Sequence, residues 1–374
     1  MDEYVSEERL VSGVFQKSAL ERVRLPSTLK RIEYCAFQEC AALKSVELPK
    51  NLAYIGKECF RQSGLEEVVF PPGLREVGPF AFYNCASLRH AELNEGLETL
   101  GAYENANGKD YEGWVFAETP LEVIRLPASL KTVELNTFVR CVQLKSVQFS
   151  EGLEKISRFA FGLSGLESVT TPASLRVIGK GAFGQCRALK LVELNDGLLE
   201  LGARENDGRE EYVGYVFIGS GIEHIRLPSS LRVIHDGTFY QCAGLAEIEL
   251  QEGIERLSRY AFRECGLLSF RAPSTLRTIC QCAFSQCARL RTVELNEGLE
   301  VLGTEEHSLE QFTFCGVFQE SGVKRVKLSS TLKVIKNDAF MGCTNLRSVR
   351  LPDGLTEIGL RAFRESGLEN ITTP

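Results

Sequence analysis

The hydrophobic residues recur in a short pattern along the whole chain, and phenylalanine is its most regular member. A Phe preceded by a small or apolar residue is followed five or six residues later by Leu-x-x-Val-x-Leu-Pro, or a close variant. Apolar and polar residues alternate within that segment, which predicts one short β-strand per repeat. The Pro predicts a bend that takes the chain out of the sheet.

The spacing of the Phe residues divides the chain into coils and the coils into blocks. Successive anchors lie 22, 23, 22 and 34 residues apart, and this series recurs with a period of 101 residues. The unit is therefore one coil, and the duplicated block is four coils. The anchors are Phe15, Phe37, Phe60, Phe82, Phe116, Phe138, Phe161, Phe183, Phe217, Phe239, Phe262, Phe284, Phe318, Phe340 and Phe363.

A single coil cannot fold alone. About six inward apolar side chains contribute roughly 1.5–3 kcal/mol each when buried, whereas ordering about 22 residues costs about 1.5 kcal/mol per residue. Each coil must therefore stack on its neighbours, which is the physics of a solenoid. The Phe column is expected to form a stacked spine near the convex side.

The quoted segments resemble the BspA-type leucine-rich repeats, whose pattern is Leu-x-x-Ile-x-Leu-Pro-x-x-Leu-x-x-Ile-Gly-x-x-Ala-Phe-x-x-Cys. The best match is LKSVELPKNLAYIGKECF at residues 43–60, after AFQEC at residues 36–40. The resemblance covers essentially the whole chain. It implies a repeat solenoid, a right-handed leucine-rich-repeat superhelix of about 15 coils with a parallel concave β-sheet and short turns or 3-10 segments on the convex side. It implies no reaction.

One continuous solenoid over residues 1–374 is the domain organisation that we expect. Its parts are a partial N-terminal insertion coil (1–14), three blocks (15–115, 116–216 and 217–317) and a partial fourth block (318–374). The chain starts within an insertion and stops within a coil, and neither a signal peptide nor a transmembrane run is visible. We therefore expect an excerpt of a longer array, or neighbours that cover the ends.

The cysteines follow the coil phase. The third residue after each Phe alternates between a hydroxyl side chain and Cys, which accounts for seven of the 13 cysteines. Cysteines two coils apart lie roughly 10 Å from each other, beyond disulfide distance. Free thiols are therefore expected, and they favour an intracellular location; a signal sequence upstream would instead favour the cell surface.

Cys265 breaks the alternation and raises the possibility of a metal site. It falls between Cys242 and Cys287 in the same column, and Cys280 and Cys282 are close in sequence. A zinc site is one reading. Stacked thiols are the preferred one, because these cysteines occupy columns that point in different directions.

The strings that resemble catalytic or cofactor-binding motifs occupy ordinary positions of the repeat. GKGAFG at residues 179–184 matches the dinucleotide-binding string Gly-x-Gly-x-x-Gly, yet it occupies the Ile-Gly-x-x-Ala-Phe phase of a coil without a strand-to-helix unit. The four histidines sit in separate coils without a recurrent carboxylate or Ser partner. We expect no enzyme activity, no cofactor and no metal.

Charges alternate along the expected concave sheet. The position before the last Leu of the strand often places opposite charges on neighbouring strands. One reading is cross-strand ion pairing that fixes the order of the coils; the other is a charge-patterned groove for a protein segment. The candidate concave-face residues are Arg24, Glu92, Arg125, Glu193, Arg226, Glu294 and Lys327.

Every fourth coil carries about eleven extra residues, at 102–114, 203–215 and 304–316. The segments 1–12, 102–113, 203–214 and 304–315 together carry a net charge of −10, whereas the whole chain carries −7, so the solenoid body is at +3. We expect these insertions to line up on one side and to contact a basic protein surface, unless their aromatics pack onto their own coils. The candidate anchors are Tyr103, Tyr111, Trp114, Tyr212, Tyr215, Phe312 and Phe314.

The sequence therefore predicts a non-enzymatic scaffold for protein–protein interaction or a structural subunit of a larger assembly. Protein is the expected partner, with neither nucleic acid binding nor membrane insertion. The alternative is a cell-surface adhesion protein, since members of the family that this chain resembles include cell-surface adhesins.

Overall fold

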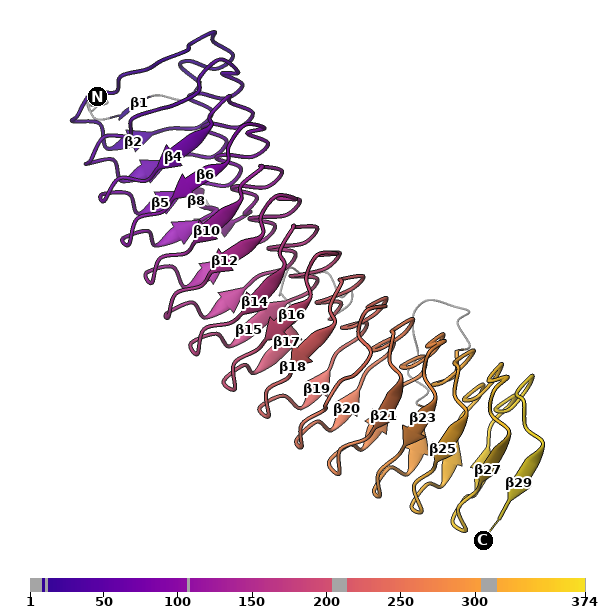
Figure 1. Cartoon of the computed structure of the whole chain (residues 1–374). Coiled ribbons are helices and arrows are strands. Elements are labelled where there is room, and N and C mark those ends of the chain that lie inside the picture. The colour runs from indigo at the N-terminus through magenta and orange to yellow at the C-terminus, as the bar shows by residue number, and fades with distance from the viewer. Residues whose placement is uncertain (1–8, 11–12, 106–107, 204–213, 304–314, 374) are drawn as a thin grey trace. The chain divides into compact units, whose positions relative to one another are not determined.

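The fold is a parallel β-solenoid in a computed structural model that describes residues 9–10, 13–105, 108–203, 214–303 and 315–373. The chain divides into two compact units, residues 1–178 and 179–374. In each unit the chain winds through successive coils, as Figure 1 shows. Only strands, turns and loops occur in the described ranges, so the convex-side turns that we expected are present without a 3-10 helix.

The first set of strands forms what we call the front face, which is the expected concave sheet. Most of its strands are the Leu-x-x-Val-x-Leu segments, and their neighbours pair in parallel, for example Glu193 with Arg226. In the first unit these strands are β4 (Glu67–Val69), β6 (His90–Glu92), β10 (Val123–Arg125), β12 (Ser146–Gln148) and β14 (Ser168–Thr170). In the second they are β16 (Leu191–Glu193), β18 (His224–Arg226), β21 (Ser269–Arg271), β23 (Thr292–Glu294), β25 (Arg325–Lys327), β27 (Ser348–Arg350) and β29 (Asn370–Thr372).

A second parallel ladder, which the repeat pattern did not predict, follows the Val, Ile or Leu that recurs in the second half of each coil. Its strands are mostly two residues long, and the buried member points inward, as Ile55 does. The strands are β1 (Arg9–Leu10), β2 (Arg31–Ile32), β3 (Tyr54–Ile55), β5 (Glu76–Val77), β7 (Thr99–Leu100), β11 (Thr132–Val133), β13 (Lys155–Ile156), β15 (Val177–Gly179), β17 (Glu200–Ala203), β19 (Val233–Ile234), β20 (Arg256–Leu257), β22 (Thr278–Ile279), β24 (Val301–Leu302), β26 (Val334–Ile335) and β28 (Glu357–Ile358).

The Phe spine is confirmed. Within each unit consecutive rings stack with their centroids 5.2–5.7 Å apart, and the rings from Phe37 to Phe340 are fully buried. Phe82 and Phe116, which are 34 residues apart in sequence, stack at 5.2 Å like any other pair. The longest coil is therefore an ordinary coil that carries an insertion.

The turns that hold the Phe spine use a left-handed residue at a fixed place. The second residue after the Phe has a positive φ in coil after coil, as at Glu39 (59°), Leu163 (59°) and Gln241 (60°). The backbone N–H groups between these turns bond to the next coil, for example from Phe37 to the Cys59 carbonyl at 2.8 Å. The turns thus form a hydrogen-bonded ladder of their own.

The hydroxyl and thiol column is confirmed, and its alternation has a chemical reason. Ser63 Oγ lies 3.4 Å from Cys85 Sγ, and Thr119 Oγ1 lies 3.5 Å from Cys141 Sγ. Each of these thiols also donates to a Phe carbonyl of the preceding coil, at 3.0 Å. A hydroxyl in one coil and a thiol in the next therefore share one buried contact.

Candidate functional site

The seven candidate concave-face residues occupy one column of the front face. All seven are exposed on the front face, and Arg24 forms an isolated parallel bridge with Glu47. In the second unit, register aligns Glu193 with Arg226 and Glu294 with Lys327. The predicted alternation of charge across neighbouring strands is therefore present there.

Within this column Glu294 pairs across neighbouring strands with Arg271 at 3.8 Å, whereas two of the arginines pair with loop carboxylates. Arg226 Nη2 lies 3.3 Å from Asp196 Oδ2, and Arg125 Nη2 lies 3.1 Å from Glu95 Oε1. Both carboxylates belong to the loop that follows the neighbouring strand. An arginine side chain reaches along its own strand direction and so meets the loop as readily as the neighbouring strand.

A second column does pair across strands. The residue after the first Leu of each strand forms exposed ion pairs between neighbouring coils: Lys44–Glu66 (3.3 Å), Arg89–Glu122 (3.5 Å), Lys145–Glu167 (3.9 Å) and Lys190–Glu223 (2.6 Å). The Lys190 ammonium lowers the pKa of Glu223 because it donates a hydrogen bond to the Glu223 carboxylate and stabilises its negative charge. Exposed pairs of this kind contribute well under about 1 kcal/mol each, so they set register more than stability.

The front sheet of the second unit is interrupted between β18 and β21. The intervening segment, residues 245–250, has the strand pattern but forms no strand. None of the described hydrogen bonds involves the backbone of Glu247, Ile248 or Glu249. Those amides and carbonyls are therefore available to solvent or to a partner.

The interruption opens a shallow hollow of about 460 Å³, which we call the front-face depression. Its floor is apolar, because Ile225 and Ile248 are half-buried, whereas Val192 and Phe270 at the same position of flanking strands are buried. The lining residues are Leu191, Val192, Glu193, His224, Ile225, Arg226, Glu247, Ile248, Glu249, Ser269 and Arg271.

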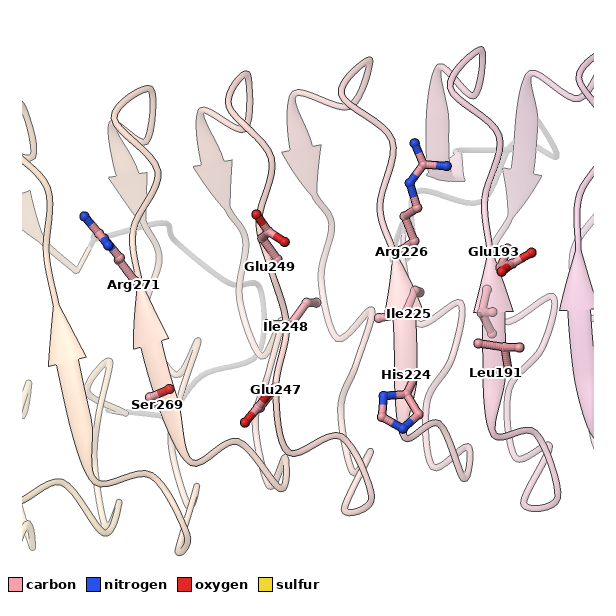
Figure 2. Close-up of a pocket in the computed structure, with 11 residues that line it drawn as sticks. Leu191, Glu193, His224, Ile225, Arg226, Glu247, Ile248, Glu249, Ser269 and Arg271 are labelled. Carbon is pink, nitrogen blue, oxygen red and sulfur yellow. The ribbon is translucent and has the colours of Figure 1, made fainter.

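Charged side chains flank this apolar floor in two rows. Figure 2 shows Glu249 between Arg226 and Arg271, and Glu247 between His224 and Ser269. Arg226 is paired with Asp196, and Arg271 lies 3.8 Å from Glu294. Glu247 and Glu249 have no ion-pair partner among the described residues, so the depression presents two uncompensated carboxylates.

A neighbouring hollow of about 530 Å³ continues the same surface. It shares Ile248, Glu249 and Arg271 with the front-face depression and extends to Glu294 and Lys327. The structure therefore brings four of the seven predicted residues onto one surface of the second unit. Arg24, Glu92 and Arg125 belong to the first unit.

Sequence reasoning missed the residues that make this hollow. Glu247, Ile248 and Glu249 carry the same strand pattern as every other coil, so their departure from the ladder has no local signal. His224 is one of the four histidines, and the sequence gives it no catalytic or metal-ligating partner that would mark it. The half-exposed Ile225 and Ile248 are indistinguishable in sequence from the buried members of their column.

Two of the predicted insertion anchors pack against the body. Trp114 stacks on Phe80 with centroids 5.9 Å apart and meets the edge of Tyr83 at 6.1 Å. Lys57 Nζ holds Glu112 Oε2 at 2.6 Å beside this stack. The Tyr215 ring covers Gly237, where it leaves no room for a Cβ atom.

The other anchors cannot be placed in this way. Tyr103 lies in β8 (Ala102–Asn105) and Tyr111 in β9 (Gly108–Tyr111), which form an antiparallel hairpin, but their side chains lie outside the described part. Tyr212, Phe312 and Phe314 lie outside the described residues altogether. All seven stay predictions.

The other sequence motifs take structural places. Gly181 of the GKGAFG string is a turn residue with φ of 61°. Cys265 donates to the Cys242 carbonyl at 3.3 Å, and burial raises its pKa well above that of a free thiol. No group of three or more metal-ligating side chains occurs within the described ranges, and the described part contains no helix long and apolar enough to cross a membrane.

Comparisons with known proteins agree with this geometry. The sequence profile of the BspA type leucine-rich repeat region matches residues 8–110, 111–205, 212–317 and 315–374. A leucine-rich repeat protein from Bacteroides ovatus is similar at 24% identity with a TM-score of 0.70, over 98% of this chain and 81% of its own. A leucine-rich cell surface protein from Faecalibacterium prausnitzii is similar at 21% identity with a TM-score of 0.50, over 98% and 88% of the two chains. Comparison with curated proteins found no significant match.

Proposed function

Because the chain belongs to the BspA-type leucine-rich repeat family, we propose that it is a non-enzymatic scaffold that binds an extended protein segment on the front face of its second unit. Repeats of this family are generally associated with protein interaction or with surface proteins. The front-face depression is the proposed binding site.

One observation carries the proposal: unpaired carboxylates stand beside half-exposed apolar side chains. Glu247 and Glu249 have no described ion-pair partner, and Ile225 of β18 and Ile248 form the apolar floor beside them. A partner with a basic side chain next to an apolar one could form an ion pair with these carboxylates and cover the apolar floor. Interfaces typically place an apolar anchor at the centre and charges at the rim.

The shape of the surface favours a polypeptide over a small molecule. Small ligands bind in concave sites that enclose most of their surface, whereas these two hollows are shallow and continue along the sheet from Leu191 to Lys327. The unpaired backbone groups of residues 247–249 add donors and acceptors of the kind that an extended chain uses. A protein segment can follow such a track across several strands.

The test is selection from a random-peptide phage library on the native protein. We expect the enriched peptides to combine Lys or Arg with an aliphatic or aromatic residue. Their binding should fall at least about tenfold in Glu249→Lys, which corresponds to roughly 1.4 kcal/mol. Val69→Lys is the matched control, because Val69 occupies the same register position in the first unit and is exposed. Peptides that bind both variants equally, or a selection without enrichment, would contradict the proposal.

The acidic insertions form a second proposed contact surface. Their net charge of −10, with the amino-terminal segment included, contrasts with a body at +3, so they would attract a basic protein at long range. Trp114 and Tyr215 already pack against the body, which favours steering by charge over anchoring by these two rings.

Cell-surface adhesion is the alternative role. The similar protein from Faecalibacterium prausnitzii is described as a cell surface protein. Labelling of intact cells with an antibody against this chain distinguishes the two: surface labelling supports adhesion, and labelling only after permeabilisation supports an internal scaffold.

A further inference from the structure

The residue that follows the third insertion differs from its counterparts after the first two. In the first, the Gly113 N–H donates to the Gly101 carbonyl at 3.0 Å, and in the second Gly214 donates to Gly202 at 3.0 Å. An added Cβ at Gly101 would lie 2.7 Å from Gly113 Cα, so the place where the insertion leaves its coil has room only for glycine. The residue three before the Phe is Gly in both cases, but in the third block it is Cys315.

Cys315 meets a second thiol at this place. The Cys282 thiol donates to the Cys315 carbonyl oxygen, with Sγ 3.4 Å from that oxygen, and interaction with the Cys315 thiol raises the pKa of Cys282. Cys282 occupies the position that Phe80 holds in the first block, two residues before the Phe anchor. In the third block Cys282 therefore stands at the place of Phe80, Cys315 at the place of Gly113 and Gly316 at the place of Trp114, so the aromatic stack is absent and two cysteines adjoin instead.

These two thiols differ in their access to solvent. Cys282 is buried, whereas Cys315 is half-buried and the remaining cysteines of the chain are buried. The hydrogen bond from Cys282 lowers the pKa of Cys315, and burial opposes this shift. Ser285 and the Arg263 guanidinium also favour the Cys315 thiolate, whereas the Glu320 carboxylate disfavours it.

We propose that Cys315 and Cys282 form a redox-active dithiol that reacts with low-molecular-weight disulfides. The half-exposed Cys315 attacks as a thiolate, breaks the S–S bond of the small molecule and releases one thiol. Cys282 then loses its proton, attacks the Cys315 sulfur and releases the second thiol. The protein dithiol is oxidised to one disulfide while the small disulfide is reduced to two thiols.

The product disulfide would tie the end of the third insertion to the coil of Phe284. Exchange of this kind needs an accessible attacking thiol with thiolate character and a second thiol within reach. The chain offers that combination at one described place, because the other described cysteines are buried. This dithiol site shares no residue with the front-face depression. The two proposals can therefore be tested independently.

The experiment treats the full chain with oxidised glutathione under native conditions, followed by alkylation and peptide mapping by mass spectrometry. We expect a peptide that links Cys282 to Cys315 and disappears on reduction. Iodoacetamide alone should modify Cys315 at least about tenfold faster than Cys141, since thiolate and exposure set the rate. Equal rates, or no linked peptide in the native protein, would overturn the proposal.

Single variants separate attack from resolution. Cys282→Ser should retain glutathione on Cys315, Cys315→Ser should leave Cys282 unmodified, and the control Cys141→Ser should form the same linked peptide as the unaltered chain. A stable glutathione adduct on Cys315 in the unaltered chain would show that Cys282 does not resolve it. The alkylation rates and the linked peptide are measured on the unaltered chain. The proposal can therefore be refuted even if a variant fails to fold.

Discussion

At the residue scale, the chemistry of this molecule is set by which side chains share a column. The hydroxyl–thiol contacts, such as Ser63 with Cys85, place polarizable groups inside the coil with their hydrogen-bonding capacity used. Burial raises the pKa of Cys85 and of Cys141 to about 11. These thiols are therefore protonated and shielded at neutral pH.

We expect Cys85, Cys141 and Cys186 to resist thiol reagents in the native protein and to react at once after unfolding. All three are fully buried. Replacement by Ser is expected to cost about 1 kcal/mol per site, because a hydroxyl keeps one hydrogen bond but fills less volume. Timed labelling followed by mass spectrometry measures the first claim, and rapid native labelling at these sites would show that the column is exposed.

The same pKa shift predicts a loss of stability at high pH. Folding raises the pKa of Cys141 from 9.0 to about 11, so the unfolded chain gives up this proton first as pH rises. The contribution of the protonated Cys141 thiol to the free energy of unfolding is complete below pH 9 and declines between pH 9 and pH 11. Urea titrations at several pH values should show this decline, and it should be smaller in Cys141→Ser, whose side chain does not ionise.

A left-handed residue in the Phe turn is a second feature of residue scale. Leu163 has a φ of 59° and a largely exposed side chain. We expect Leu163→Gly to stabilise the protein by about 0.5–1 kcal/mol, because glycine adopts this conformation without steric cost. Val142→Gly is the control: Val142 is also exposed but has no positive φ, so the same change should destabilise. Equal losses at both sites would refute the explanation.

At the element scale, the insertions are additions to coils that are complete without them. Phe82 and Phe116 stack at the same distance as neighbours 22 residues apart. We expect deletion of residues 102–112, which leaves four residues between Leu100 and Phe116 as residues 56–59 do between Ile55 and Phe60, to keep the fold intact, with a melting temperature changed by only a few degrees. Calorimetry measures this, with Phe116→Ala as the contrasting variant, expected to lose about 3–5 kcal/mol. A larger loss from the insertion change than from Phe116→Ala would contradict this view.

Periodicity explains why the elements were predictable and where prediction stopped. The Phe spine, the strand positions and the Cys column repeat in every block, so each was supported many times by the sequence. The second ladder escaped notice because strands as short as Tyr54–Ile55 have no alternation of their own. The front-face depression could not be predicted, because Ile248 and Val192 hold the same position of the repeat and differ only in whether their backbone pairs with a neighbouring strand.

The partners of charged groups were only partly predictable for a similar reason. Alternating charge predicted pairs such as Lys44–Glu66, which the structure contains. It also suggested that Arg226 would meet Glu193, whereas the ion pair at 3.3 Å joins Arg226 to Asp196 in a loop. Strand register is encoded by the repeat, but the reach of a long side chain is not.

At the scale of the whole molecule, stability is expected to depend on neighbouring coils rather than on one core. Removal of block 116–216 joins Val115 to Phe217 and so preserves the Val-Phe step and the alternating column. Removal of residues 138–160 leaves Thr119 facing Ser164 and deletes the Thr119–Cys141 contact. We therefore expect the single-coil deletion to unfold at the lower temperature, although it removes fewer residues. The reverse order would show that the four-coil block has no structural meaning.

The most direct test of the account is hydrogen–deuterium exchange with and without a peptide selected on the native protein. The account predicts protection in residues 224–226, 245–250 and 269–271, where backbone groups of the interrupted segment are free to bond to the peptide. Unchanged exchange in these segments, with protection instead in residues 102–114 or 203–215, would place binding on the insertions and contradict the front-face site.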